Sequence, residues 1–278
     1  MTMAELPELE ILRRDLDKEV GGKRIKTVEA PSAATIKRGG PKKALVSRLE
    51  GCKLESVARR GTWLVLGLDS GEFLMITLGD RASLRRNQNK DETLKGTAVV
   101  LTFTQHGQLR LIDPAKSSEL FVVADKDAVD EVVGALGLDL VDEPISWTTF
   151  GEMVLRRQGN LKSALMDPSM LVGIGTMYSD EILFEAGLRW DRPASGLSTQ
   201  EIRRLYRAAV EIVHDAVKHG GATAALDGIP TLSGQPGGYS PMINVYQRDG
   251  QMSPRARGPI VKAKFGAGFT YFCEQTQI

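Results

Sequence analysis

The pattern of apolar residues in this chain changes from strand-like to helical near its middle, and that change limits the folds open to it. From about Arg24 to His106 and beyond, short β-rich runs are separated by turn residues. Thr62 to Leu68, for example, leads into the turn Asp69-Ser70-Gly71, and Glu72 to Leu78 returns, which is typical of an antiparallel hairpin. From Trp147 onward the apolar residues recur at helical spacing. The sequence therefore predicts an α+β protein in which a β-sandwich is followed by a helical domain.

The expected domain boundaries follow this change of pattern. Residues 1–135 would form an N-terminal helix and β-sandwich, and the acidic, turn-rich residues 136–147 a linker. A helical domain would occupy residues 148–240, in which Ser198 and Glu201 have the spacing of a capping box. The last segment, 241–278, again has strand-like and turn-like features.

Composition excludes several classes of protein. With 36 Lys and Arg against 35 Asp and Glu, the net charge is +1, so any polyanion must be bound by local clusters of basic residues. No apolar run reaches the length of a signal peptide core or a membrane span, so we expect a protein without membrane contact that is cytoplasmic, or nucleoid-associated if bacterial. We also expect a monomer. Cys52 and Cys273 are too few for a disulfide framework, and His106, His214 and His219 are too scattered for a metal site.

The segment Met3 to Glu10 has the features of a helix start. Pro7 suits a first helical position, and Glu8 and Glu10 place negative charge at the positive end of the helix dipole. An ordinary amphipathic helix would explain these features. The run Glu-Leu-Pro-Glu-Leu-Glu also resembles the start of the formamidopyrimidine-DNA glycosylase / endonuclease VIII family. That resemblance implies that the catalytic residues are Ala4, through its α-amine, Glu5 and Glu8.

A second motif lies between Leu165 and Phe184. Gly173-Ile174-Gly175 precedes a predicted helix, and a glycine turn at a helix N-terminus can bind an anion such as a DNA phosphate. Glycines that serve only tight helix packing are the alternative. The whole motif is similar to the helix–two-turn–helix signature of the same family. In that signature Lys162 matches a phosphate-binding lysine, and Thr176 replaces an asparagine that holds the same phosphate.

Other positions depart from the family pattern. Thr62 replaces the family's catalytic lysine, and Gly268 replaces the finger arginine that holds the lesion phosphate. The side chains that fill the space of the flipped base are also replaced, at Asp80 and at Ala115-Lys116-Ser117. Loss at all these positions together indicates a changed function.

The tail resembles the family's zinc finger without its ligands. The four cysteine positions are occupied by Ser253, Ala256, Cys273 and Thr276. One thiolate cannot hold structural zinc, which takes four nitrogen or sulfur ligands, so we expect a zincless β-hairpin finger and no metal or other cofactor. Its basic side chains are either an ordinary solvated face or a phosphate-binding surface, and the resemblance favours the second interpretation.

The resemblance implies that the partner is damaged or abasic double-stranded DNA, with the damaged base flipped out of the helix. Two functions remain open: a base excision repair glycosylase with weak or absent abasic-site lyase activity, and a catalytically inactive DNA-damage-binding protein. The residues expected to contact DNA are Arg59, Arg60, Lys116, Lys162, Gly173, Gly175, Thr176, Arg255, Arg257, Lys262 and Lys264. The loop from Asp227 to Ser240, which would read the lesion, has no decodable pattern.

The chemistry expected of Ala4 depends on where translation begins. In the chain as written, Met1-Thr2-Met3 precede Ala4, so its nitrogen is an amide and the site would be inactive. A start at Met3 followed by removal of the methionine would give Ala4 a free α-amine, whose unperturbed pKa is about 8. We expect that form to keep weak glycosylase or lyase activity.

Overall fold

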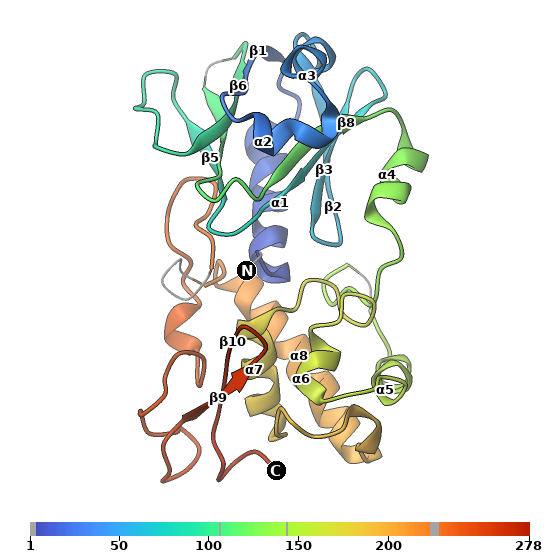
Figure 1. The fold of residues 1–278 in the computed structure, drawn as a ribbon, viewed down its shortest axis with the longest axis vertical. Coiled ribbons are helices and arrows are strands. Elements are labelled where there is room, and N and C mark those ends of the chain that lie inside the picture. Colours follow the sequence, from blue (N-terminus) through green and yellow to red (C-terminus); the bar gives the residue numbers. More distant parts are fainter. Residues whose placement is uncertain (1–3, 106, 143, 223–227) are drawn as a thin grey trace. The chain divides into compact units, whose positions relative to one another are not determined.

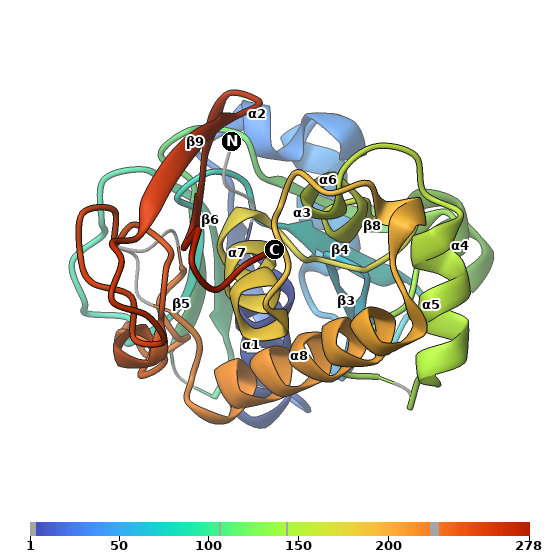
Figure 2. The ribbon, with the colours of Figure 1, turned by 90° about the horizontal axis from the view of Figure 1, so that it is seen from below.

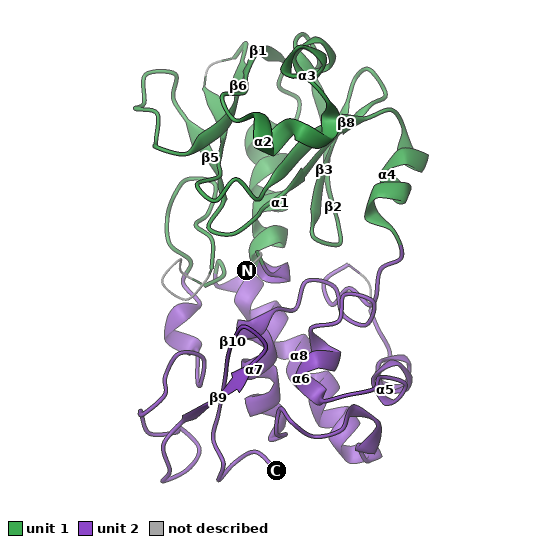
Figure 3. Cartoon of the chain, viewed as in Figure 1, with its two compact units in different colours: residues 1–4, 8–134, 220–237 green, residues 5–7, 135–219, 238–278 purple. Residues whose placement is uncertain are grey.

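The computed structural model describes residues 4–105, 107–142, 144–222 and 228–278, which form two compact units (Figure 3). Unit 1 consists of Met1–Ala4, Glu8–Gly134 and Gly220–Gly237. Unit 2 consists of Glu5–Pro7, Ala135–His219 and Gly238–Ile278.

Unit 1 contains two four-stranded antiparallel sheets (Figure 1). One has the strand order β2-β3-β4-β8, with bounds Leu54–Arg60, Trp63–Leu68, Phe73–Thr77 and Glu119–Val123. The other has the order β1-β6-β7-β5, with bounds Ile25–Glu29, Thr97–Phe103, Gln108–Ile112 and Ser83–Asn87. The expected antiparallel sandwich, including its hairpin of β3 and β4, is confirmed.

Helix α1 (Leu6–Val20) supplies one side of the core of unit 1. Its apolar stripe of Leu9, Leu12, Leu16 and Val20 is at most 1% exposed. These side chains belong to one buried cluster with apolar residues of both sheets, such as Leu64 of β3 and Leu101 of β6. Burial of this stripe explains why the three- and four-residue spacing forms a helix here.

The expectation of a strand-like pattern from Arg24 onward is wrong between residues 33 and 49. This segment forms α2 (Ala33–Ile36), the 3-10 turn η1 (Lys37–Gly39) and α3 (Lys42–Leu49). Pro41 stands at the N-cap of α3, and Leu45 and Leu49, four residues apart, are its buried side chains. Residues four apart lie on the same face of a helix and also on the same face of a strand. The spacing of the apolar residues therefore did not distinguish a helix from a strand here. Helix α4 (Lys126–Val133) completes unit 1.

Residues 220–237, expected in the helical domain, are grouped with unit 1 instead. The N–H of Arg86 on β5 donates to the carbonyl of Leu232 at 2.8 Å, so this segment hydrogen-bonds to a strand of the sandwich. Ile229 and Leu232 are buried in the core of unit 1. Burial of these two side chains accounts for the return of the chain to the first unit.

Unit 2 is mainly helical and ends in a hairpin. Its helices are α5 (Trp147–Leu155), α6 (Leu161–Leu165), α7 (Thr176–Ala186) and α8 (Thr199–Lys218), with 3-10 turns η2 (Ala194–Gly196) and η4 (Ser240–Met242). Helix α7 packs along α8 (Figure 2). The expected capping box at the start of α8 is confirmed, because Ser198 and Glu201 exchange side-chain-to-backbone hydrogen bonds. Strands β9 (Val261–Phe265) and β10 (Gly268–Phe272) form the expected terminal hairpin.

Among the helices of the described residues, none has the length and apolarity needed to cross a membrane.

Candidate functional site

The carboxylate of Glu5 lies at the N-terminus of helix α7. It accepts hydrogen bonds from the backbone N–H groups of Gly175 at 2.6 Å, Met177 at 3.1 Å and Tyr178 at 3.4 Å. The first N–H groups of a helix have no partner within the helix, and the helix dipole favours an anion there. Glu5 is therefore fixed by the two-turn motif, although 170 residues separate them in sequence.

The glycines of this motif make room for the N-terminal segment. Gly173 has φ of +64°, which favours glycine, and its carbonyl accepts a 2.7 Å hydrogen bond from the N–H of Leu6. A Cβ at Gly175 would lie 2.6 Å from Cδ of Glu5. Both glycines therefore allow close approach of Glu5 and Leu6 to the turn.

This geometry corrects one sequence-based expectation. The anion at the N-terminus of α7 is a carboxylate of the chain itself, and the Gly175 N–H expected to bind a DNA phosphate donates to Glu5. The carbonyl of Thr176 accepts hydrogen bonds from Lys162 and from the hydroxyl of Ser179. A phosphate contact by Gly173 or by the Thr176 side chain stays a prediction.

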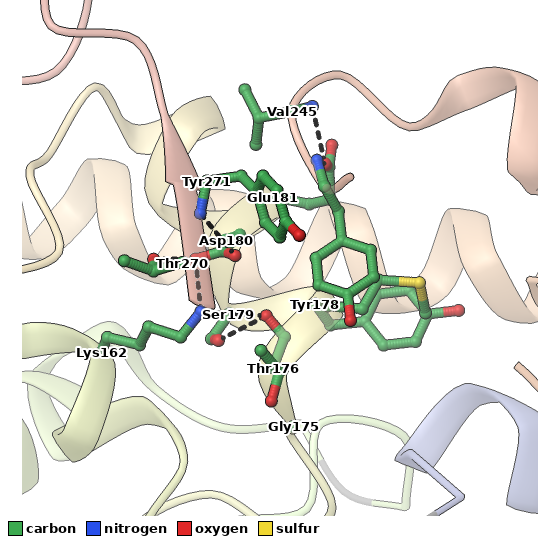
Figure 4. A network of polar contacts seen from close by, with 12 residues as sticks. Lys162, Gly175, Thr176, Tyr178, Ser179, Asp180, Glu181, Val245, Thr270 and Tyr271 are labelled. Atoms are coloured by element: carbon green, nitrogen blue, oxygen red, sulfur yellow. Dashed lines mark hydrogen bonds and ion pairs between the residues drawn. The ribbon is translucent and has the colours of Figure 1, made fainter. Parts of the chain in front are cut away.

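Lys162, the expected phosphate-binding lysine, is fully buried in an ion pair (Figure 4). Its Nζ lies 2.5 Å from Oδ1 of Asp180 and donates to the carbonyl of Thr176 at 3.1 Å. The ammonium also lies 5.2 Å from the ring centroid of Phe265. In this structure the charge of Lys162 is satisfied within unit 2, and its role in DNA binding stays a prediction.

Two consecutive acidic residues of α7 hold the terminal segment to the helices (Figure 4). Asp180 accepts from the hydroxyl of Thr270 at 2.5 Å and from the N–H of Tyr271 at 3.0 Å, both on β10. Glu181 accepts from the N–H groups of Asn244, Val245 and Tyr246 at 2.7 to 2.9 Å. Neither residue was predicted from the sequence. The usable signal was an acidic pair in the middle of a helix whose other residues are mostly apolar, because a buried acid needs polar partners.

Burial governs the titration of this network. Burial raises the pKa of the Asp180 carboxyl and lowers the pKa of the Lys162 ammonium, and the attraction between the two groups opposes both shifts. Burial also raises the pKa of Glu181, against four hydrogen bonds that favour its ionised form. These charges can remain inside the protein because each is paired or fully hydrogen-bonded.

The other expected catalytic residues, Ala4 and Glu8, are grouped with unit 1. Ala4 is buried in the core cluster of that unit. Glu8 is 3% exposed, and its Oε1 accepts from the N–H of Ala222 at 2.9 Å. Gly221, with φ of +75°, permits this approach, because a Cβ there would lie 2.9 Å from the same oxygen. Glu8 therefore anchors the segment that follows helix α8.

The adjacent arginines Arg59 and Arg60 have different surroundings. The side chain of Arg59 is inaccessible, with Nε 3.2 Å from Oε2 of Glu10 on α1, so the phosphate contact expected of it is not available in this structure. Arg60 is exposed and pairs with Asp130 at 3.0 Å. Lys116, also expected to bind DNA, is exposed and adopts φ of +55°.

The positions in the sandwich that depart from the family pattern are all half-buried or exposed. Thr62 follows Gly61 in the turn between β2 and β3 and is half-buried. The hydroxyl of Ser117 accepts from the N–H of Asp80 at 2.9 Å, so two of the replaced positions are neighbours. Neither residue offers a positive charge or an apolar wedge.

Sequence reasoning also missed Arg85 on β5. Its guanidinium is half-buried, lies against Gly234, and has Nε without a hydrogen-bond partner among the described residues. Burial lowers the pKa of Arg85. The run Ser83-Leu84-Arg85-Arg86 has two adjacent arginines and no motif around them, so nothing in the sequence marked this residue.

The four basic residues of the terminal segment that are expected to contact DNA differ in their surroundings. Arg255 pairs with Glu185 and its guanidinium lies 5.0 Å from the Phe184 ring centroid, so it packs against α7. Lys262 pairs with Asp249 at 2.8 Å. Arg257 and Lys264 are exposed, and neither has an ion pair among the residues that the structure describes.

The four former ligand positions do not fit zinc. Cys273 is the only sulfur donor among them, is fully buried, and packs in a cluster with Phe184, Val245 and Ile260 against which Ala256 lies. Burial would raise the pKa of the Cys273 thiol, but hydrogen bonds involving Thr276 and Ser253 outweigh it and lower that pKa. Within the described ranges, no group of three His, Cys, Asp or Glu residues is placed to hold a metal. These four positions are held by apolar packing and by hydrogen bonds of the Ser253 and Thr276 hydroxyls.

Two domain families match most of the chain. Residues 3–120 match the formamidopyrimidine-DNA glycosylase N-terminal domain, and residues 136–227 match the formamidopyrimidine-DNA glycosylase H2TH domain. Among curated proteins, the formamidopyrimidine-DNA glycosylase of Pelotomaculum thermopropionicum is 30% identical over 279 residues, covering 99% of each chain. That of Listeria monocytogenes is 31% identical over 277 residues, covering 99% of this chain and 100% of its own.

Solved structures have the same fold. The MutM (Fpg) protein of Thermus thermophilus superposes with a TM-score of 0.86 at 30% identity, covering 98% of both chains. The Lactococcus lactis Fpg, in a complex with DNA containing an abasic site, gives a TM-score of 0.90 at 24% identity, covering 99% of both chains.

Proposed function

Because the chain belongs to the formamidopyrimidine-DNA glycosylase family, we propose that it is a DNA glycosylase of base excision repair, which binds damaged duplex DNA and removes a base. The observation that carries this proposal is the Glu5 carboxylate, held by three backbone N–H groups at the start of α7. Charge-assisted hydrogen bonds of this kind fix a carboxylate in position for acid–base chemistry. Glu5 directly follows Ala4, the position expected to supply the nucleophile.

The reaction requires a form of the chain that begins at Ala4. Its neutral α-amine would attack the anomeric carbon of the damaged nucleotide, and the bond from that carbon to the base would break, with the electron pair leaving on the base. Loss of a proton from nitrogen and opening of the sugar ring then give a Schiff base. The Glu5 carboxylate would accept the proton that the nitrogen loses and donate it to the ring oxygen as the ring opens.

Exposed basic residues would supply the DNA contacts. Arg60, Lys116, Arg257 and Lys264 have accessible charges. The Lactococcus lactis relative is in a complex with abasic DNA, which supports the same class of partner here. Contacts to phosphates release counterions, so the affinity for duplex DNA should fall steeply between about 50 and 200 mM salt.

A panel of duplexes, each with one damaged base, tests the glycosylase proposal by measuring release of the free base. We expect the chain shortened to begin at Ala4 to release the damaged base from one or more of these duplexes. It should release no base from intact duplex. Glu5→Gln should reduce release by at least about 100-fold, the usual minimum for a general acid–base group. Glu131→Gln, at an exposed residue of α4, is the matched control and should have no effect. Release that is equal in Glu5→Gln and the parent would contradict the proposal.

A second function, damage binding without catalysis, is favoured by two positions at which the family resemblance implies an available lysine charge. Thr62 is a neutral hydroxyl, and the charge of Lys162 is buried against Asp180. A protein of this kind would bind abasic duplex more tightly than intact duplex and release no base from any lesion of the panel. The two measurements, binding and base release, therefore separate the two functions.

A further inference from the structure

The outward face of the terminal hairpin carries an exposed aromatic ring. In the register of β9 and β10, Phe269 is opposite Lys264 and Tyr271 is opposite Lys262, so these four side chains share one face. Phe269 is 44% exposed and is the one aromatic residue among the exposed large hydrophobic side chains of the described chain. The exposed part of the Phe269 ring is available for contact with a partner.

The hairpin does not need Phe269 for its own packing. Phe265 and Phe272 lie on the opposite face, with ring centroids 5.9 and 6.4 Å from that of Trp190. Thr270 of the same strand is anchored by Asp180. These contacts fix β10 to the helices of unit 2 and leave the ring of Phe269 at the surface.

Two ammonium groups flank this ring. Nζ of Lys264 lies 5.2 Å and Nζ of Lys262 lies 5.5 Å from the Phe269 centroid, within the range of cation–π attraction. The sequence has no acidic residue between Asp249 and Glu274. Asp249 pairs with Lys262 at 2.8 Å, whereas Lys264 has no ion pair among the described residues. A ring with two ammonium groups beside it matches a ligand that has a flat π-surface next to negative charge.

We propose that Phe269 stacks on an unstacked nucleobase of damaged DNA while Lys262 and Lys264 contact the flanking phosphates. The proposal rests on the DNA binding of the proposed function and assigns a base-recognition surface to the hairpin. In intact duplex the faces of the bases are covered by their neighbours. The base opposite an abasic site has no pairing partner, so it costs less free energy to unstack, and once unstacked it presents its face to an aromatic side chain.

The binding test uses a fluorescein-labelled duplex with a tetrahydrofuran abasic analogue opposite an adenine, and the same duplex fully paired. Phe269→Ala should weaken binding to the abasic duplex by roughly 5- to 150-fold, the range for loss of one stacked base. Binding to the paired duplex should change less than about twofold, within the effect expected of a neutral surface substitution. Phe269→Trp should bind the abasic duplex at least as tightly as the parent, because it keeps a π-surface.

Met252→Ala is the matched control, since Met252 is 59% exposed in the same terminal segment but has no flanking lysines. It should bind both duplexes like the parent. Lys264→Ala should weaken binding to both duplexes to a similar degree, because a phosphate contact is independent of the base. It should also lower the slope of log affinity against log salt concentration by about 1.

A second readout reports stacking directly. With 2-aminopurine in place of the adenine opposite the abasic analogue, binding of the parent should change its fluorescence, and binding of Phe269→Ala at saturation should not. Equal affinities for the abasic duplex together with equal fluorescence changes in parent and Phe269→Ala would overturn the stacking proposal while leaving DNA binding intact. If the parent binds neither duplex at low salt, the proposed function fails as well.

Discussion

Glu5 shows how a catalytic candidate is positioned by residues distant in sequence. Its identity could be predicted from the N-terminal pattern, but its partners, Gly175, Met177 and Tyr178, could not. Glycines before a helix are compatible with a phosphate or a carboxylate ligand, because both are anions that bind helix N-termini. The sequence alone does not say which anion is present, and here it is a side chain of the protein.

Lys162 and Asp180 allow a direct test of the buried network. Lys162→Met should destabilise the protein by about 3–5 kcal/mol, because it leaves the Asp180 carboxylate buried without its cation. Urea unfolding followed by circular dichroism measures the change. Arg156→Met is the control, since the Arg156 side chain is 79% exposed in a weak pair with Glu152, and it should alter stability by less than about 1 kcal/mol.

The double variant Lys162→Met/Asp180→Asn refines this test. Because it removes both charges, it should be more stable than Lys162→Met alone. If Lys162→Met unfolds at the same urea concentration as the parent, the ion pair does not have the structural importance assigned to it.

Helix α8 provides a prediction at the level of an element. Hydrogen bonds from Arg192 and from Ser198 lower the pKa of Glu201 to about 2, below its ordinary value of 4.5. The carboxylate therefore contributes stability that is present above pH 4.5 and is lost as the pH falls toward 2. Glu201→Gln should flatten this part of the curve of unfolding free energy against pH. If the unfolding free energy of the variant falls with pH below 4.5 as steeply as that of the parent, Glu201 does not make this contribution.

The cap of the same helix can be tested separately. Ser198→Ala removes the hydroxyl that accepts from the N–H of Glu201 and should cost about 0.5–2 kcal/mol. Thermal unfolding of this variant beside Thr199→Ala, one residue further into the helix, would show whether the loss is specific to the cap. Equal melting temperatures for the two variants would argue against it.

Elements were predictable where local pattern and packing agree. The stripe of α1, the hairpin of β3 and β4 and the capping box of α8 follow from spacing and end residues alone. Helices α2 and α3 did not, because their short apolar repeats fit more than one period. The terminal hairpin was predictable from its strand-like pattern, but its anchoring by Asp180 and Glu181 depends on contacts across 63 to 91 residues.

At the scale of the whole molecule, the two compact units do not follow the order of the chain. Residues 5–7 group with the helical unit, and residues 220–237 group with the sandwich. Local patterns cannot reveal such exchanges, since they arise from long-range burial of side chains such as Ile229 and Leu232. Residues 136–147, expected to form a linker, are part of unit 2, which also begins again at Gly238 rather than ending at residue 240.

Borohydride trapping on abasic duplex DNA tests the central claim, that Ala4 and Glu5 carry glycosylase chemistry. Borohydride reduces a Schiff base between the Ala4 amine and the sugar to a stable covalent bond, which is detected as a protein–DNA adduct on a denaturing gel. The account predicts an adduct from the chain shortened to begin at Ala4, much less from its Glu5→Gln variant, and none from the full chain of 278 residues, whose Ala4 nitrogen is an amide. No adduct from the shortened chain under conditions where it binds the duplex would contradict the account.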